Sequence, residues 1–189
     1  MASLLKVSKT IDSVLAFMAK IGSWAGLVMV IIVVFDVVSR KMGINKEALF
    51  GYNSTQFQES EYWLHTFLFA LVIGYAYTAQ AHVRIDLIRD KLPLKTKYLI
   101  EMIGCLVFLI PYAILAFTLS IDYVGASYRS GEVSKSVIGL SHIWVLKSAL
   151  FFMYGLMGLA GVSQFIKSLA GYAGALPDEM VTQTVGGDH

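Results

Sequence analysis

Residues 63–81 form a mostly apolar segment that is long enough to cross the hydrocarbon of a membrane as a helix. Only His65 and Gln80 interrupt it as strongly polar residues. A surface helix of a soluble protein has one polar face, and this segment has none of comparable size. Hydrophobic residues make up 57% of the chain and charged residues 15%, against about 25% charged residues in soluble proteins. We therefore interpret the chain as an integral membrane protein.

The composition excludes several classes of function. A chain of 189 residues has room for several membrane spans, but not for these spans plus a folded soluble domain. The sequence has no basic stripe of the kind that binds nucleic acid and no Gly-rich phosphate loop after a strand. Cys105 is the single cysteine, so neither an intrachain disulfide nor a thiolate metal cluster can form.

The apolar runs predict four membrane spans, at about residues 21–39, 62–81, 98–121 and 143–168. Segments that cross lipid must be helical, because lipid offers no partner for unpaired backbone groups. The predicted fold class is all-α, with four transmembrane helices and short interfacial helical segments such as one within 82–97. Residues 1–170 would form one membrane domain, and residues 171–189 a disordered cytoplasmic tail.

The distribution of positive charge predicts the orientation in the membrane. Nine of the 15 Lys and Arg residues fall on the side that holds the N-terminal segment, the connection 82–97 and the tail, and the opposite side has fewer. Cytoplasmic connections are enriched in Lys and Arg. Both termini are therefore predicted to be cytoplasmic.

Ionisable residues in or beside the spans are candidates for functional or structural contacts. Asp36 and Arg40 have the spacing at which opposite charges meet on one helix face. They would form a neutral pair at the outer boundary, or Asp36 would bind a partner subunit. Glu59, at the outer start of the second span, could pair with a basic group on a neighbouring chain, and Glu61 would face solvent. None of these residues forms a convincing catalytic pair or metal site.

Two histidines leave an alternative function open. His65 and His142 are both expected near the outer boundary, on different helices. Two imidazoles at equal depth could bind a haem, as in the membrane anchor of a respiratory or quinone-reactive enzyme. A small self-sufficient transporter or channel is a third alternative, although no ring of charged residues supports it.

Small residues and one proline indicate how the helices pack. Small side chains four residues apart allow helix backbones to approach closely, either within this bundle or against a partner. Pro111, in the middle of the third span, predicts a kink or a local break in helical hydrogen bonding. The small residues are Gly22, Gly26, Ala70, Gly74, Gly155, Gly158 and Gly161.

The junction after the second span resembles a known family. A span that opens with Glu59 and ends in the sequence AHVRIDL at residues 81–87, followed by Leu92 and Pro93, is similar to the small membrane subunit of tripartite ATP-independent periplasmic (TRAP) transporters. The stretch 128–134 with Trp144 and Lys147 resembles the branch assigned to mannitol or chloroaromatic compounds. The resemblance covers about residues 20–168.

The resemblance implies a non-catalytic subunit of the bacterial inner membrane, without cofactor, that contacts lipid and two proteins. Its partners would be a large multi-spanning subunit of the elevator type and a periplasmic binding protein that delivers an organic acid for sodium-coupled uptake. This chain would enlarge the static scaffold, and its outer connections 41–58 and 126–142 could touch the binding protein. By the same resemblance, Glu59, His82, Arg84 and Asp86 would shape the junction and the subunit contacts.

Overall fold

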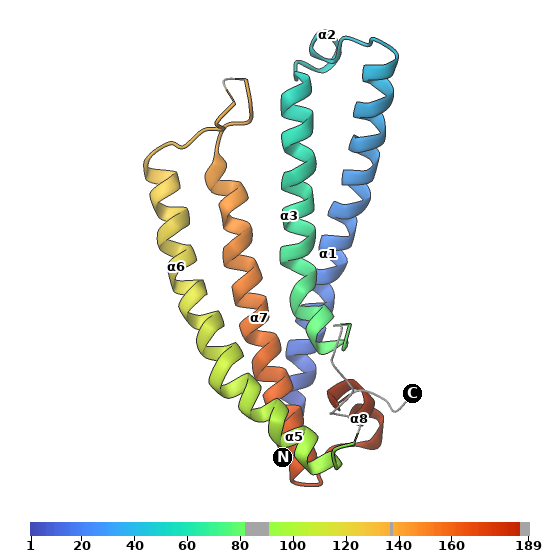
Figure 1. Cartoon of the computed structure of the whole chain (residues 1–189), viewed down its shortest axis with the longest axis vertical. Helices are drawn as coiled ribbons and strands as arrows, with labels where there is room; N and C mark the ends of the chain where they lie inside the picture. Colours follow the sequence, from blue (N-terminus) through green and yellow to red (C-terminus); the bar gives the residue numbers. More distant parts are fainter. Residues whose placement is uncertain (82–90, 137, 186–189) are drawn as a thin grey trace.

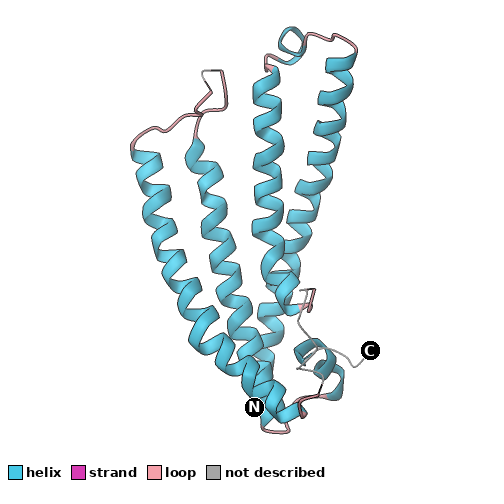
Figure 2. Cartoon of the chain, in the orientation of Figure 1, coloured by secondary structure: helices cyan, strands magenta, loops and turns pink. Residues whose placement is uncertain are grey.

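The computed structural model describes residues 1–81, 91–136 and 138–185, and within these ranges all regular structure is helical. The expected short helix within 82–97 falls mostly on residues outside them. Figure 1 shows a bundle in which α1 (Ala2–Lys41) lies beside α3 (Ser54–Thr78), and α6 (Ile110–Arg129) beside α7 (Ile143–Tyr172). The all-helical prediction is confirmed, as Figure 2 shows.

Three helical segments are long and apolar enough to cross a membrane: Ala2–Lys41, Leu94–Arg129 and Ile143–Tyr172. They contain the spans predicted at 21–39, 98–121 and 143–168. The helix α3, which holds most of the predicted span 62–81, is not among the three, because polar residues such as Glu61 and His65 dilute its apolar character. The fourth span therefore stays a prediction.

The second membrane-crossing segment is irregular next to Pro111. It consists of α5 (Leu94–Ile103), a π-helical turn at Gly104–Leu109 and then α6. Proline has no backbone N–H and its ring collides with the carbonyl four residues earlier. A π-helical turn admits one extra residue and relieves this collision. The local break predicted from Pro111 is thus present, and the chain changes direction between α5 and α6 (Figure 1).

The small residues pack inside this bundle. A Cβ atom on Gly22 would lie 3.0 Å from Cβ of Leu71, and one on Gly74 would lie 2.8 Å from the carbonyl oxygen of Leu156. The glycines of α7 pack in the same way against α6 and the π-helical turn. Where these helices meet, the buried residues Leu15, Leu71, Leu156 and Ala160 form the core.

A short helix, α8 (Asp178–Val185), lies within the segment for which we expected disorder. Met180, Thr184 and Val185 are buried, and α8 packs against α5 and α7. We expected disorder because the segment is polar in composition, and this composition gave no indication that three of its residues pack against the bundle. The N-terminal end of α1 lies at the same end of the molecule as α8 (Figure 1).

Candidate functional site

A buried ion cluster joins the end of α1 to α2 (Lys46–Phe50). The expected pair of Asp36 and Arg40 is present, and Asp36 is fully buried. Lys46, which is 3% exposed, also contacts the Asp36 carboxylate. The short helix that presents Lys46 starts at Asn45, whose side chain accepts a hydrogen bond from the Ala48 amide. Sequence analysis missed Lys46, because no local spacing rule connects residues ten positions apart across a turn.

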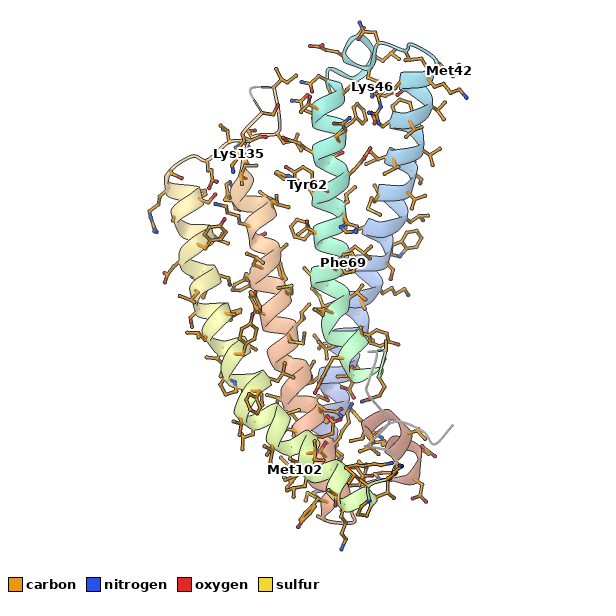
Figure 3. The ribbon with its side chains drawn as sticks, viewed as in Figure 1. Met42, Lys46, Tyr62, Phe69, Met102 and Lys135 are labelled. Atoms are coloured by element: carbon orange, nitrogen blue, oxygen red, sulfur yellow. The ribbon has the colours of Figure 1, made fainter. Side chains whose placement is uncertain are left out.

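Three phenylalanines surround this cluster. The ring centroids of Phe35 and Phe50 are 5.5 Å apart, and those of Phe35 and Phe57 are 5.7 Å apart. The Lys46 ammonium lies 5.3 Å from the centroid of Phe57. Rings in this arrangement exclude water, which strengthens the attraction between the charges. Lys46 lies where α2 covers the ends of α1 and α3 (Figure 3).

Glu59 holds the N-terminal end of α3 to the connection between α6 and α7. Its carboxylate accepts a hydrogen bond from the Ser134 hydroxyl and another from the Leu140 amide. The Asn53 side chain donates to the Ile138 carbonyl oxygen at 2.8 Å. Glu59 is 7% exposed. We expected a basic partner on a neighbouring chain, and the described contacts of Glu59 are instead uncharged groups of its own chain.

A second charged pair stabilises the same connection. Lys147 in α7 binds Glu132 at 2.5 Å, and its ammonium lies 3.9 Å from the centroid of the Tyr123 ring. The hydrogen bond from Lys147 lowers the pKa of Glu132 below its ordinary value. The structure directs its ammonium to Glu132 and Tyr123 of its own chain.

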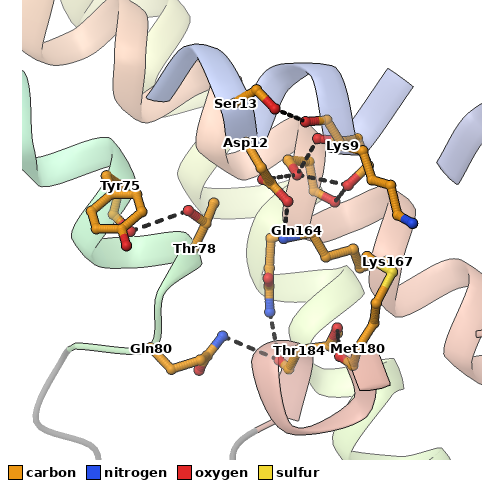
Figure 4. Close-up of polar contacts among 12 residues, drawn as sticks. Lys9, Asp12, Ser13, Tyr75, Thr78, Gln80, Gln164, Lys167, Met180 and Thr184 are labelled. Atoms are coloured by element: carbon orange, nitrogen blue, oxygen red, sulfur yellow. Dashed lines mark hydrogen bonds and ion pairs between the residues drawn. The ribbon is translucent and has the colours of Figure 1, made fainter. Parts of the chain in front are cut away.

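The opposite end of the bundle has a larger polar network (Figure 4). Lys167 in α7 is 1% exposed and pairs with Asp12 in α1 at 2.7 Å. Ser163 Oγ donates to Asp12 Oδ1 at 2.6 Å and lies 2.8 Å from Ser8 Oγ. These contacts fix the first turns of α1 against the last turns of α7. Asp12 was not predicted, because it lies outside the predicted span, where a carboxylate is unremarkable.

The same network reaches α8. Gln164, which is fully buried, donates to the Thr184 carbonyl oxygen at 2.6 Å, and Gln80 donates to the same oxygen at 3.3 Å. Gln80 lies two residues after the end of α3 and has a φ of 58°, in the left-handed region. The chain then enters the predicted junction. His82, Arg84 and Asp86 of that junction lie outside the described residues, so their predicted contacts stay predictions.

The two histidines considered as haem ligands have separate surroundings. His65 is exposed on α3, and its ring packs against Phe69 of the same helix at a centroid distance of 4.6 Å. His142 precedes α7 with a φ of 65°, and its Nδ1 lies 2.8 Å from Ser141 Oγ. No group of three or more His, Cys, Asp or Glu residues in the described parts of the chain could hold a metal ion. No described contact favours the haem alternative.

Comparison with known proteins gives one match. The family described as tripartite ATP-independent periplasmic transporters, DctQ component, matches residues 29–171. The match includes Glu59, the ion cluster at Asp36 and all of α3, α5 and α6. It leaves out residues 2–28 of α1 and all of α8. Neither a curated protein nor a solved structure matches the chain significantly.

Proposed function

Since the chain belongs to the DctQ component family of the tripartite ATP-independent periplasmic transporters, we propose that it is the non-catalytic subunit that holds the large membrane subunit in place. Members of this family are integral proteins of the inner membrane that work with a large membrane subunit and a substrate-binding protein. The transported substrate would be an organic acid, its uptake would be coupled to sodium, and the binding protein would deliver it. Assignment to the mannitol or chloroaromatic branch is part of the same proposal.

One observation carries the scaffold role. Three of the buried charges at the ends of the described bundle, Asp36, Lys46 and Lys167, are paired within the chain, Glu59 is held by hydrogen bonds, and the core between the two ends is apolar. A transporter places its substrate and ion sites near the midplane, on broken helices with exposed backbone groups. The break at Gly104–Leu109 retains its helical turns and is lined by apolar side chains. This arrangement suits a rigid support better than a moving substrate site.

The proposed topology has four spans, with α3 as the fourth and both termini in the cytoplasm. Its support is the common end shared by the N-terminus and α8, together with the bias of Lys and Arg towards that side. The connections 41–58 and 126–142 would then face the periplasm, where the binding protein acts. The contacts of Glu59 would keep these two connections in a fixed relation to one another.

Reconstitution tests the proposal. The large subunit would be placed in vesicles with and without this chain, and uptake of a labelled carboxylate would be measured with the binding protein present and a sodium gradient applied. We expect uptake only when both membrane subunits are present, and no uptake by this chain alone. Uptake by vesicles that contain only this chain would contradict the scaffold role. A haem absorbance band in the purified complex would support the haem alternative instead, with His65 and His142 as the candidate ligands.

A further inference from the structure

An apolar stripe with a seven-residue repeat runs along the exposed side of α1. Its residues recur at alternating intervals of three and four, which is the pattern of a coiled-coil seam. Phe17, Trp24 and Ile31 are the most exposed, at 63%, 62% and 60%. We call the stripe the α1 seam. It consists of Val7, Val14, Ile21 and Val28 in one column and Phe17, Trp24, Ile31 and Val38 in the other, with Thr10 at the first position of the second column. Phe35 continues the first column but packs against Phe50 and Phe57 of its own chain.

The α1 seam is longer than the membrane hydrocarbon. From Val7 to Val38 a helix rises about 46 Å, at 1.5 Å per residue. A typical tilt of about 20° shortens the projection to about 44 Å, against a hydrocarbon thickness of about 30 Å. Wherever α1 sits in the membrane, lipid chains therefore leave about a third of the α1 seam uncovered.

The part of α1 before the predicted span shows that the α1 seam is a distinct feature. Within the hydrocarbon, positions beside the α1 seam are apolar as well, as lipid requires. In residues 6–20 the exposed neighbours are Lys6, Lys9, Ser13, Ala16 and Lys20, four of them polar, while Val7, Val14 and Phe17 remain apolar and exposed. This segment continues the 40-residue helix α1 without a break, and its inward side packs on α7, where Ser8 contacts Ser163 and Leu15 contacts Leu156.

The charges beside the α1 seam indicate which kind of helix could pack against it. In the heptad, Lys6, Ser13 and Lys20 occupy the flanking position from which residues pair with the opposing helix. The other flanking position holds Ile11 and Met18. A second copy of this chain would therefore offer its own lysines and no acidic group there. The favoured partner is a different helix, with apolar residues at heptad spacing and acidic residues at the end that extends past the membrane.

We propose that the α1 seam packs lengthwise against a helix of the large membrane subunit that leaves the membrane together with α1 and carries acidic side chains opposite Lys6 and Lys20. This inference rests on the proposed function, because that function supplies the large subunit. The larger part of the α1 seam, from Val7 to Val28, lies outside the segment that matches the family. A sustained seven-residue repeat implies a left-handed crossing, at about 20° between the two helices.

Photo-crosslinking in the intact complex tests the proposal. A photoreactive phenylalanine derivative would replace Val14, Phe17 or Trp24 in the α1 seam, one at a time. Matched controls would carry it at Lys9 or Ala16, which are exposed on the same helix but lie outside the α1 seam. We expect crosslinks to the large subunit from the three seam positions, and loss of crosslinking at the two control positions.

Each contrary result has its own meaning. Equal crosslinking from all five positions, or crosslinks only between copies of this chain, would overturn the proposed packing. Co-purification of the large subunit without any crosslink from the seam would also overturn it, while leaving the proposed function intact. Absence of co-purification would contradict the proposed function itself.

The charge part of the proposal has a separate test. Replacing Lys6→Glu together with Lys20→Glu should abolish the crosslink from Val14, because acidic groups would then face acidic groups. The matched control is Lys9→Glu together with Lys41→Glu, which makes the same change in charge outside the flanking positions and should retain the crosslink. Equal crosslinking in the two double variants would contradict an acidic partner.

Discussion

Lys167 in α7 and Asp12 in α1 form an ion pair at 2.7 Å across the end of the bundle, with Lys167 almost completely buried and Asp12 27% exposed. This pair joins residues 155 positions apart in the chain. Because Lys167 is buried, removing Asp12 would leave an uncompensated charge inside the protein, and this loss of stability is larger than the stability that the pair itself adds.

The first prediction concerns this pair. Asp12→Ala leaves the Lys167 ammonium buried without its counter-ion, and removal of one partner from a buried pair costs about 3–5 kcal/mol. We expect the lower end of that range, because Asp12 is partly exposed. Unfolding of the detergent-solubilised protein, followed by circular dichroism, measures the loss. Lys9→Ala, at an exposed position of the same helix, should change little. A double variant with Asp12→Leu and Lys167→Met should recover most of the lost stability.

The second prediction separates the two cations that bind Asp36. Lys46 is buried and Arg40 is about half exposed, so Lys46→Ala should destabilise the protein more than Arg40→Ala. Loss of an exposed pair lowers stability by about 0.2–1 kcal/mol, whereas removing Lys46 also leaves the buried Asp36 carboxylate without its buried counter-ion. Parallel unfolding measurements on both variants, with Lys41→Ala as a control, would show the order. Equal losses for Lys46→Ala and Arg40→Ala would mean that Asp36 does not depend on α2.

A third prediction tests whether Glu59 holds the connection between α6 and α7 in place. Glu59→Ala removes the acceptor for the Ser134 hydroxyl and the Leu140 amide. A buried donor left without a partner costs about 1–3 kcal/mol. We expect faster hydrogen exchange in residues 132–142 and unchanged exchange in α1. The control is Glu47→Ala in α2, on the neighbouring connection. Protection of residues 132–142 that survives Glu59→Ala would show that other contacts hold them.

The fourth prediction is a pH dependence. The pKa of Glu132 is lowered in the folded protein, mainly by the hydrogen bond from Lys147. A lowered carboxyl pKa contributes stability that is present above the unfolded value, near 4.5, and is lost as pH falls through the lower folded value. The wild-type protein should therefore exceed Glu132→Gln in stability at pH 7, and the difference should shrink below about pH 4.5. A difference that stays constant from pH 7 to pH 3 would contradict the pairing.

Sequence reasoning succeeded where one physical rule acts locally. The apolar runs located three membrane-crossing segments, because lipid imposes length and composition. The Asp36–Arg40 pair followed from helical spacing, and the break beside Pro111 from the missing amide hydrogen. The span in α3 stays a prediction, since the polar first turns of this helix contact the connections beside it and dilute its apolar character.

The missed contacts are those made by residues far apart in the sequence. The partner of Lys46 is 10 positions away in the sequence, that of Ser134 is 75 positions away, and Ser163 is 151 positions from Asp12. No spacing rule relates such pairs. The acidic, Gly-rich tail gave no sign of α8, because among its described residues three are buried, Met180, Thr184 and Val185. Gln164 in α7 donates to the Thr184 carbonyl oxygen, a contact that no local pattern in the tail predicts.

The position of α7 has a consequence for how the protein is made. This helix packs against α1, α3, α5 and α6, and it is the last of the long helices in the chain. Translation releases the N-terminal residues first. During synthesis α1 and α3 can pair early, before the residues that contact Asp12 and Glu59 have been translated. The end held by Lys167 therefore closes only once α7 has been translated, and a chain that stops before α7 leaves Asp12 without this partner.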